Sequence, residues 1–261
     1  MSASPHAELQ RRFRARLTAG EALLGTFLKT PTSHATEILG AAGFDFVVVD
    51  AEHAPFAEDD IDRLMLAARA AAIPSIVRVA SAAEDKIQTA LDCGAAGVLV
   101  PHVYSAERLR GIVAASRFKG GRRGFSNSPR AGEYGRLGFA EHMANADNLT
   151  AVIAMIEDPE ALDVLDDIFA VEGLTAAFIG RGDLSARLGA PNVSHPQVRA
   201  VVERITASAR QHRIPLIAHV GGGDDPDVSE LRDLGVNAFL VASDQGFIRQ
   251  SAVLTRKLFD G

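Results

Sequence analysis

Ionisable side chains directly follow a strand-like run of β-branched residues. The run at 47–49 is three consecutive valines, and Asp50, Glu52 and His53 come immediately after it. An apolar β-branched run is typical of a buried strand, and α/β folds carry out their chemistry where such strands end. Carboxylates and an imidazole at that place can bind a cation or transfer protons. The pattern indicates an enzyme without saying which kind.

Other ionisable residues stand at comparable places. Arg78 lies in the third strand-like run, Glu157 ends the fifth, and Asp183 follows the sixth. Two carboxylates suit a hard divalent cation, because oxygen ligands favour Mg²⁺ or Mn²⁺, whereas the sequence has no cluster of Cys and His residues for zinc. Taken singly, Glu157 could be an ion-pair partner and Asp183 a helix N-cap. Their joint position at strand ends favours a functional site.

These residues need a framework that brings strand ends together. Eight short apolar runs alternate with amphipathic segments such as 58–72 and 197–211, and the runs are 24–28, 46–50, 75–79, 97–101, 151–157, 175–180, 215–220 and 237–242. Eight βα units in 261 residues predict an α/β protein with a single (β/α)8 TIM barrel over 1–261. A doubly wound sheet is the alternative, but no glycine-rich dinucleotide fingerprint follows the first run. We also expect an N-terminal helix, and a C-terminal helix at 247–259 that packs on the barrel or exchanges with a neighbouring subunit.

Composition restricts the partners. The formal charge of −6 is spread over interspersed acids and bases, without a basic stripe for nucleic acid. No apolar stretch is long enough to cross a bilayer, so we expect a soluble, cytoplasmic protein that does not bind membranes. The single cysteine, Cys93, lies in an apolar helical pattern and is interpreted as a small buried hydrophobe.

One long connection interrupts the alternation. It runs from about 118 to 148 and carries Arg122, Arg123 and Arg130, which could bind a carboxylate or phosphate. Long connections in compact domains are often functional. A substrate-binding loop and a surface excursion or subunit contact are equally compatible with this segment.

Several motifs together resemble the HpcH/HpaI aldolase family, in matching order from about residue 24 to 242. The matching segments are DAEHAP at 50–55, IVR at 76–78, VP at 100–101, IE at 156–157 and FIGRGDLS at 178–185. The resemblance implies a class II pyruvate aldolase on a (β/α)8 barrel, commonly a homohexamer. Such enzymes use a divalent metal, here most simply Mg²⁺ or Mn²⁺ with Co²⁺ as a further option, to cleave 4-hydroxy-2-oxo acids into pyruvate or hydroxypyruvate and an aldehyde.

The resemblance also implies roles for the site residues. Glu157 and Asp183 would be metal ligands, Arg78 would bind the keto oxygen, and His53 would transfer protons. Asp50 and Asp92 would orient that histidine, whereas Glu52 is left as a rim group. The backbone amides of Gly182 and Asp183 would bind the pyruvate carboxylate. Phe27 lies where an aromatic residue often lines the site in this family, and barrel core is an equal interpretation.

Some alternatives stay open. Lys29 at the end of the first run could form a Schiff base, as in class I aldolases. Arg181 stands where the family commonly has proline, so its side chain could extend over the pocket and alter the substrate preference. His102 and His219 are interpreted as solvent-exposed or packing residues. A citrate lyase β-like enzyme acting on acyl-CoA thioesters and a non-catalytic barrel subunit are the alternative functions.

Overall fold

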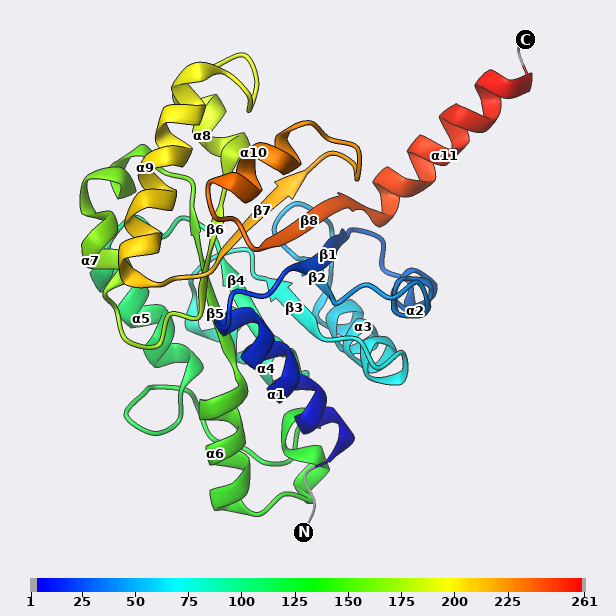
Figure 1. Ribbon diagram of the computed structural model, residues 1–261. Helices are drawn as coiled ribbons and strands as arrows, with labels where there is room; N and C mark the ends of the chain where they lie inside the picture. Colours follow the sequence, from blue (N-terminus) through cyan, green and yellow to red (C-terminus); the bar gives the residue numbers. More distant parts are fainter. Residues whose placement is uncertain (1–3, 260–261) are drawn as a thin grey trace.

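The computed structural model describes residues 4–259 and has a closed barrel of eight parallel strands, each paired with the next in chain order and β8 with β1 (Figure 1). The strands are β1 Leu23–Leu28, β2 Phe46–Asp50, β3 Ser75–Arg78, β4 Gly97–Val100, β5 Ala151–Ile156, β6 Ala176–Ile179, β7 Leu216–Val220 and β8 Ala238–Ser243. The predicted (β/α)8 fold is confirmed. All eight predicted strand segments coincide with these strands to within two residues at each end.

Each strand is apolar along its length because both of its faces are buried. In β2, Phe46 and Val48 belong to the cluster inside the barrel, whereas Val47 and Val49 pack against the surrounding helices. This division follows from the alternation of side chains along a strand. It also directs Asp50, the next inward residue after Val48, to the carboxyl-terminal mouth of the barrel.

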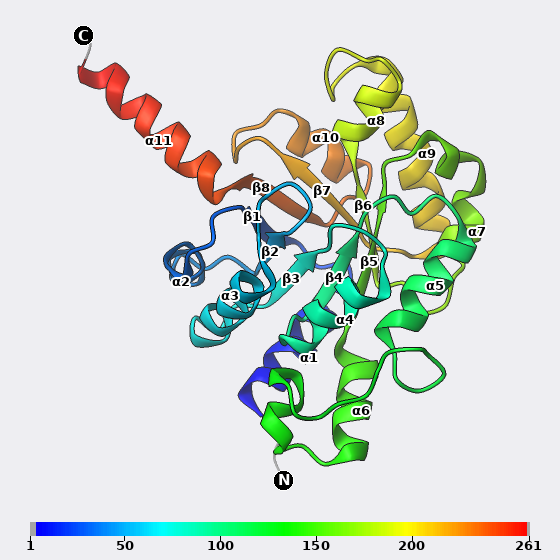
Figure 2. The same cartoon turned by 180° about the vertical axis from the view of Figure 1, so that it is seen from behind.

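The helices surround the barrel (Figures 1 and 2). They are α2 Ser33–Ala41, α3 Glu58–Ala70, α4 Glu84–Asp92, α5 Ala106–Ser116, α7 Leu165–Phe169, α8 Arg181–Arg187, α9 Pro196–His212 and α10 Asp227–Asp233, with a short 3₁₀ helix, η2, at Pro159–Val164. The helices predicted at 58–72 and 197–211 are α3 and α9. Their first turns are favourable for helices: α3 begins with three acidic residues, and Pro196 is the first residue of α9.

The amino-terminal end of the barrel is closed by α1, Pro5–Thr18. Phe13 and Leu17 of this helix join the cluster inside the barrel, and the Phe13 ring lies 5.4 Å from that of Phe46. The predicted N-terminal helix therefore plugs this end. Substrate access is left to the opposite, carboxyl-terminal mouth.

The long connection lies at the closed end. It contains η1 Arg130–Gly135 and α6 Phe139–Leu149, and Figure 1 shows α6 beside α1, far from α8 and α10. It joins the end of α5 to the start of β5, and such αβ connections run over the amino-terminal face of a barrel. The interpretation of this connection as a substrate-binding loop is therefore wrong for a site at the carboxyl-terminal mouth of the same barrel. Its arginines instead form ion pairs, Arg122 with Glu84, Arg123 with Asp92 and Arg130 with Asp62, each at 2.7 Å.

The C-terminal helix α11, Asp244–Phe259, projects away from the barrel (Figures 1 and 2). Its only buried residue is Asp244, whose carboxylate accepts hydrogen bonds from the amides of Lys29 and Thr30. The exposed apolar side chains of this helix are Ile248, Val253, Leu254, Leu258 and Phe259. Over residues 4–259, no helix is long and apolar enough to cross a membrane.

Candidate active site and metal centre

A cavity of about 750 Å³ opens at the carboxyl-terminal mouth of the barrel. Five of the predicted site residues line it, namely Phe27, His53, Arg78, Gly182 and Asp183. They come from strand ends or from the segments that directly follow them. The expected convergence of these residues on one rim is therefore present in the structure.

A buried ion pair forms the floor of this site. Arg78 donates from Nε to Oδ1 of Asp50 at 2.8 Å and from Nη2 to Oδ2 at 2.6 Å. The Nζ of Lys29 lies 3.1 Å from the same carboxylate. Burial alone would raise the pKa of Asp50, but the hydrogen bonds and charge of Arg78 outweigh it and leave that pKa below its usual value. Asp50 therefore holds Arg78 as a fixed cation.

Asp50 has a different relation to His53 from the predicted one. The carboxylate accepts a hydrogen bond from the backbone amide of His53 at 3.1 Å, so it stabilises the turn after β2. The imidazole instead lies near Glu52, with 3.6 Å between Nε2 and Oε2. The His53 side chain is 54% exposed and faces the cavity. Glu52, and not Asp50, is the carboxylate beside the ring.

Phe27 belongs to both the core and the cavity wall. It is only 4% exposed, and the guanidinium of Arg78 lies over its ring at 4.6 Å from the centroid. The rings of Phe178 and His219 lie 6.3 and 5.8 Å away. Stacking on an aromatic face adds to the ion pair in fixing the guanidinium.

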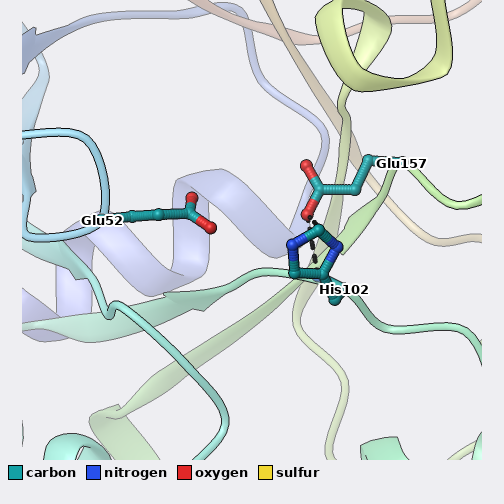
Figure 3. A group of neighbouring side chains, drawn as sticks. All are labelled: Glu52, His102 and Glu157. Atoms are coloured by element: carbon teal, nitrogen blue, oxygen red, sulfur yellow. Dashed lines mark hydrogen bonds and ion pairs between the residues drawn. The ribbon is translucent and has the colours of Figure 1, made fainter. Parts of the chain in front are cut away.

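Three ligand-bearing side chains gather beside this floor. Glu52, His102 and Glu157 each offer an atom within 4.8 Å of those of the other two, and Figure 3 shows both carboxylates directed toward the space beside the His102 ring. They follow β2, β4 and β5, of which β4 and β5 are paired in the barrel. Glu157 was predicted as a ligand, whereas Glu52 was placed outside the metal site and His102 was given no role.

The electrostatics of this group suit a cation. Burial, reinforced by the charges of Asp183 and Glu52, raises the pKa of Glu157 to about 6. Burial also raises the pKa of Glu52. The charge of Asp183 adds to this rise, whereas the charges of Arg78 and His102 oppose it. Asp183 is therefore close enough to act on both glutamates. A divalent cation would relieve this repulsion, and the donor set of carboxylates with one imidazole fits such an ion.

Gly180 makes room for Glu157. A Cβ atom at this position would lie 2.5 Å from Cβ and 2.8 Å from Oε2 of Glu157, closer than non-bonded atoms approach. Gly180 is the residue before α8, so the chain turns into the helix directly against the glutamate. A larger residue at position 180 of the FIGRGDLS segment would therefore clash with Glu157.

Two further residues of the cavity are His219, which was given no role from the sequence, and Lys29, for which a Schiff base was left open. His219 is the last residue but one of β7 and lines the cavity, and its pKa is lowered by burial at the barrel mouth and by the charges of Arg181, Lys29 and Arg78. Lys29 also lines the cavity. His219 stands next to the end of its strand, which is the signal that could have identified it.

Two predicted placements are not found. Asp92 ends α4 at the opposite end of the barrel, where it pairs with Arg123, so it does not lie beside His53 of the same chain. Arg181 lines the cavity, but its side chain is held back by other residues and does not extend over it. It pairs with Asp227, donates to the carbonyl oxygen of His219 at 2.8 Å, and has a side chain only 8% exposed.

Comparisons with known proteins show the family to which the chain belongs. A family model described as HpcH/HpaI aldolase/citrate lyase matches residues 23–250. The 2-keto-3-deoxy-L-rhamnonate aldolase of Escherichia coli strain K12 is 36% identical over 201 residues, which are 76% of this chain and 74% of that protein.

Solved structures extend the similarity over nearly the whole chain. An HpcH/HpaI aldolase from Desulfitobacterium hafniense DCB-2 is 26% identical with a TM-score of 0.88, and the match covers 94% of this chain and 95% of that one. Citrate synthase SbnG is 32% identical with a TM-score of 0.83, and that match covers 95% and 98%. The chain therefore belongs to the HpcH/HpaI aldolase/citrate lyase family, and the enzyme class predicted from its sequence, a carbon–carbon lyase of the aldolase type, is confirmed.

Proposed function

We propose that this enzyme reversibly cleaves 4-hydroxy-2-oxo acids into pyruvate, or hydroxypyruvate, and an aldehyde, with a divalent cation as its cofactor. The observation that carries the proposal is the fixed cation of Arg78, which lines the cavity and lies 3.4 Å from Glu52 of the group formed by Glu52, His102 and Glu157. A 2-oxo acid has two adjacent oxygen atoms that such an arrangement can bind. Cleavage of its C3–C4 bond develops negative charge on one of them.

Glu157 and Asp183 would hold the cation, which we take as Mg²⁺ or Mn²⁺ with Co²⁺ as a further option. A cation bound there supplies Lewis-acid charge for the keto oxygen of the substrate. Arg78 adds positive charge that the ion pair with Asp50 and the ring of Phe27 hold in place. Such preorganised charge costs no reorganisation when the enolate forms.

His53 would accept the proton of the C4 hydroxyl group. As that proton leaves, the electrons of the O–H bond form the carbonyl of the aldehyde, the C3–C4 bond breaks, and its electron pair becomes the enolate of the oxo acid. A proton then returns to C3 and gives the product. The His53 ring faces the cavity next to Glu52, and a neighbouring carboxylate stabilises the imidazolium that forms.

The substrate carboxylate would bind at the start of α8. The first amides of a helix have no acceptor within that helix, and Gly182 and Asp183 are its second and third residues. No atom lies within 4 Å of where a Cβ of Gly182 would be, so this position is open. The proposal places the reacting carbon atoms between this turn and His53.

A Schiff-base mechanism is less well supported. Lys29 is held in an ion pair with Asp50, whereas a Schiff base requires a free, neutral amine. A citrate lyase β-like reaction on acyl-CoA thioesters is the alternative function predicted from the sequence. Because the chain is also similar to a citrate synthase, the experiment below includes an acyl-CoA thioester as a substrate.

The test is pyruvate release from racemic 4-hydroxy-2-oxo acids of different chain length, measured before and after EDTA treatment and after Mg²⁺ or Mn²⁺ is restored. We expect activity to disappear with chelation and return with the metal. Activity that survives chelation but is lost on borohydride treatment with pyruvate would instead implicate Lys29. Turnover of an acyl-CoA thioester without pyruvate release would favour the alternative function.

We also propose a homo-oligomer, a hexamer by family resemblance, in which α11 packs on another copy. The support is the row of exposed apolar side chains on a helix that projects from its own barrel (Figure 1). Asp92 lies at the wrong end of the barrel to act on His53 of its own chain, so its predicted role is kept only for a contact between subunits. The cytoplasmic location stays a prediction.

A further inference from the structure

We propose that His102 is a direct nitrogen ligand of the metal, so that the site has a mixed nitrogen and oxygen donor set. The inference rests on the proposed metal dependence and concerns a residue that the sequence motifs do not include. It changes the cation that the site should prefer.

The position of His102 is fixed by Glu157 itself. Its backbone amide donates to Oε1 of Glu157 at 2.8 Å, and its ring Nδ1 lies 3.3 Å from the same oxygen. The backbone of His102 has a φ of +57°, a left-handed conformation that few non-glycine residues adopt, with asparagine, aspartate and histidine the most frequent among them. The hydrogen bond to Glu157 holds the backbone in this conformation and keeps the ring beside the carboxylate.

A second carboxylate orients the ring. Both oxygens of Asp158 lie 3.3 Å from Nδ1 of His102, and Asp158 is itself buried and paired with Arg187 at 3.0 Å. Metal-binding histidines generally donate one ring N–H to a carboxylate, which leaves the other nitrogen for the metal. With Nδ1 protonated toward Asp158, Nε2 of His102 keeps its lone pair for a cation.

The opposite side of the group has an unsatisfied acceptor. Oε2 of Glu52 is buried and accepts no hydrogen bond from the described residues, although Nη1 of Arg78 lies 3.4 Å away and Nε2 of His53 lies 3.6 Å away. A buried carboxylate oxygen without a donor is costly, and a cation shared with His102 and Glu157 would satisfy it. Figure 3 shows that the Glu52 carboxylate is directed toward this group.

The donor set predicts the metal preference. Carboxylates alone suit Mg²⁺ and Mn²⁺, whereas an imidazole ligand increases the affinity for Co²⁺, Ni²⁺ and Zn²⁺. We therefore expect Co²⁺ to bind more tightly than Mg²⁺, and expect the difference to shrink when the imidazole is removed.

The test is pulsed electron paramagnetic resonance of the Mn²⁺-loaded protein, which detects nitrogen-14 coupled to the bound ion. We compare the wild type with His102→Asn, because asparagine tolerates a positive φ. His34→Gln, a change at an exposed histidine on α2, is the matched control. Titration with Co²⁺ and Mg²⁺ gives the affinities of the same three proteins.

We expect a histidine nitrogen signal in the wild type and in His34→Gln, and none in His102→Asn. The His102 variant should lose at least ~10-fold in Co²⁺ affinity and less in Mg²⁺ affinity, on the scale of disrupted metal-site partners. Bound Mn²⁺ with the same spectrum in all three proteins would overturn the assignment while leaving the metal-dependent aldolase intact. A wild type that binds no metal would instead contradict the proposed function.

Discussion

At the residue scale, Arg78 has both a structural and a catalytic part. It satisfies the fully buried Asp50, and its guanidinium also faces the cavity. Removing one partner of a buried ion pair is strongly destabilising because the other charge is left uncompensated. A loss of activity on mutation of Arg78 therefore does not distinguish its structural role from its catalytic role.

A double substitution separates them. Arg78→Met should lower the melting temperature by several degrees and reduce kcat by about 10²-fold, the scale of losing one oxyanion donor. Adding Asp50→Asn should restore much of the melting temperature without restoring kcat. Thermal unfolding and steady-state kinetics of both variants check this. If kcat recovers together with stability, Arg78 is only structural.

Glu157 gives a prediction about pH. Burial raises its pKa from 4.5 to about 6, so the ionised carboxylate is less favourable in the folded protein than in the unfolded chain. The resulting loss of stability is absent below pH 4.5, grows as the pH rises, and is complete above about 6. Bound metal should offset it.

In metal-free protein at pH 8, Glu157→Gln should therefore melt a few degrees higher than the wild type, and the difference should shrink toward pH 5. The same variant should lose the stabilisation that Mn²⁺ gives the wild type, which is about 2.7 kcal/mol at a hundredfold excess over Kd. Glu160→Gln, at an exposed glutamate nearby, is the control. A metal-free Glu157→Gln protein that melts below the wild type at pH 8 contradicts the electrostatic account.

At the scale of elements, the sequence was sufficient for the strands and for residues at their carboxyl ends. β-branched runs buried on both faces are distinctive, and Glu157, Arg78 and His53 follow directly from them. It was insufficient for the long connection, because arginine content does not reveal which end of a barrel a segment reaches. The position of the connection after α5 does reveal the end that it reaches, because αβ connections return to the amino-terminal face.

The contact of His102 with Glu157 was also missed. The two residues are 55 positions apart and meet because β4 and β5 are neighbours in the barrel, paired from Gly97 with Ala151 to Val100 with Ala154. Ligand spacing along the chain cannot show such a pair. Once the order of the strands in the barrel is known, such a pair can be predicted by looking for side chains within two residues of the ends of adjacent strands.

Gly180 tests how closely α8 must approach β5. Gly180→Ala places a methyl group against Glu157, so we expect metal affinity and kcat/KM to fall at least ~10-fold, on the scale of other disturbed metal-site neighbours. Gly138→Ala is the control, because a Cβ there meets no atom within 4 Å. Metal titration and kinetics decide the point. Unchanged metal affinity in Gly180→Ala would show that Glu157 does not hold the ion.

At the scale of the whole molecule, α11 has no buried residue after Asp244 and carries a row of exposed apolar side chains. Leu254→Asp combined with Leu258→Asp should convert an oligomer into smaller species in analytical ultracentrifugation. Arg249→Asp, on the same helix, is a control for added negative charge. A wild type that sediments as a monomer contradicts the proposed assembly without affecting the chemistry of the barrel.

The central claim is that this cavity forms an enolate from a 2-oxo acid with the help of a bound divalent cation. Exchange of the pyruvate methyl protons in D₂O, followed by nuclear magnetic resonance, tests it without knowledge of the aldehyde. We predict exchange with Mg²⁺, none after complete chelation, and at least ~10³-fold slower exchange in Glu157→Gln, a loss of about 4 kcal/mol. Exchange that persists in the chelated wild type, or that is absent with every divalent cation, would contradict the account.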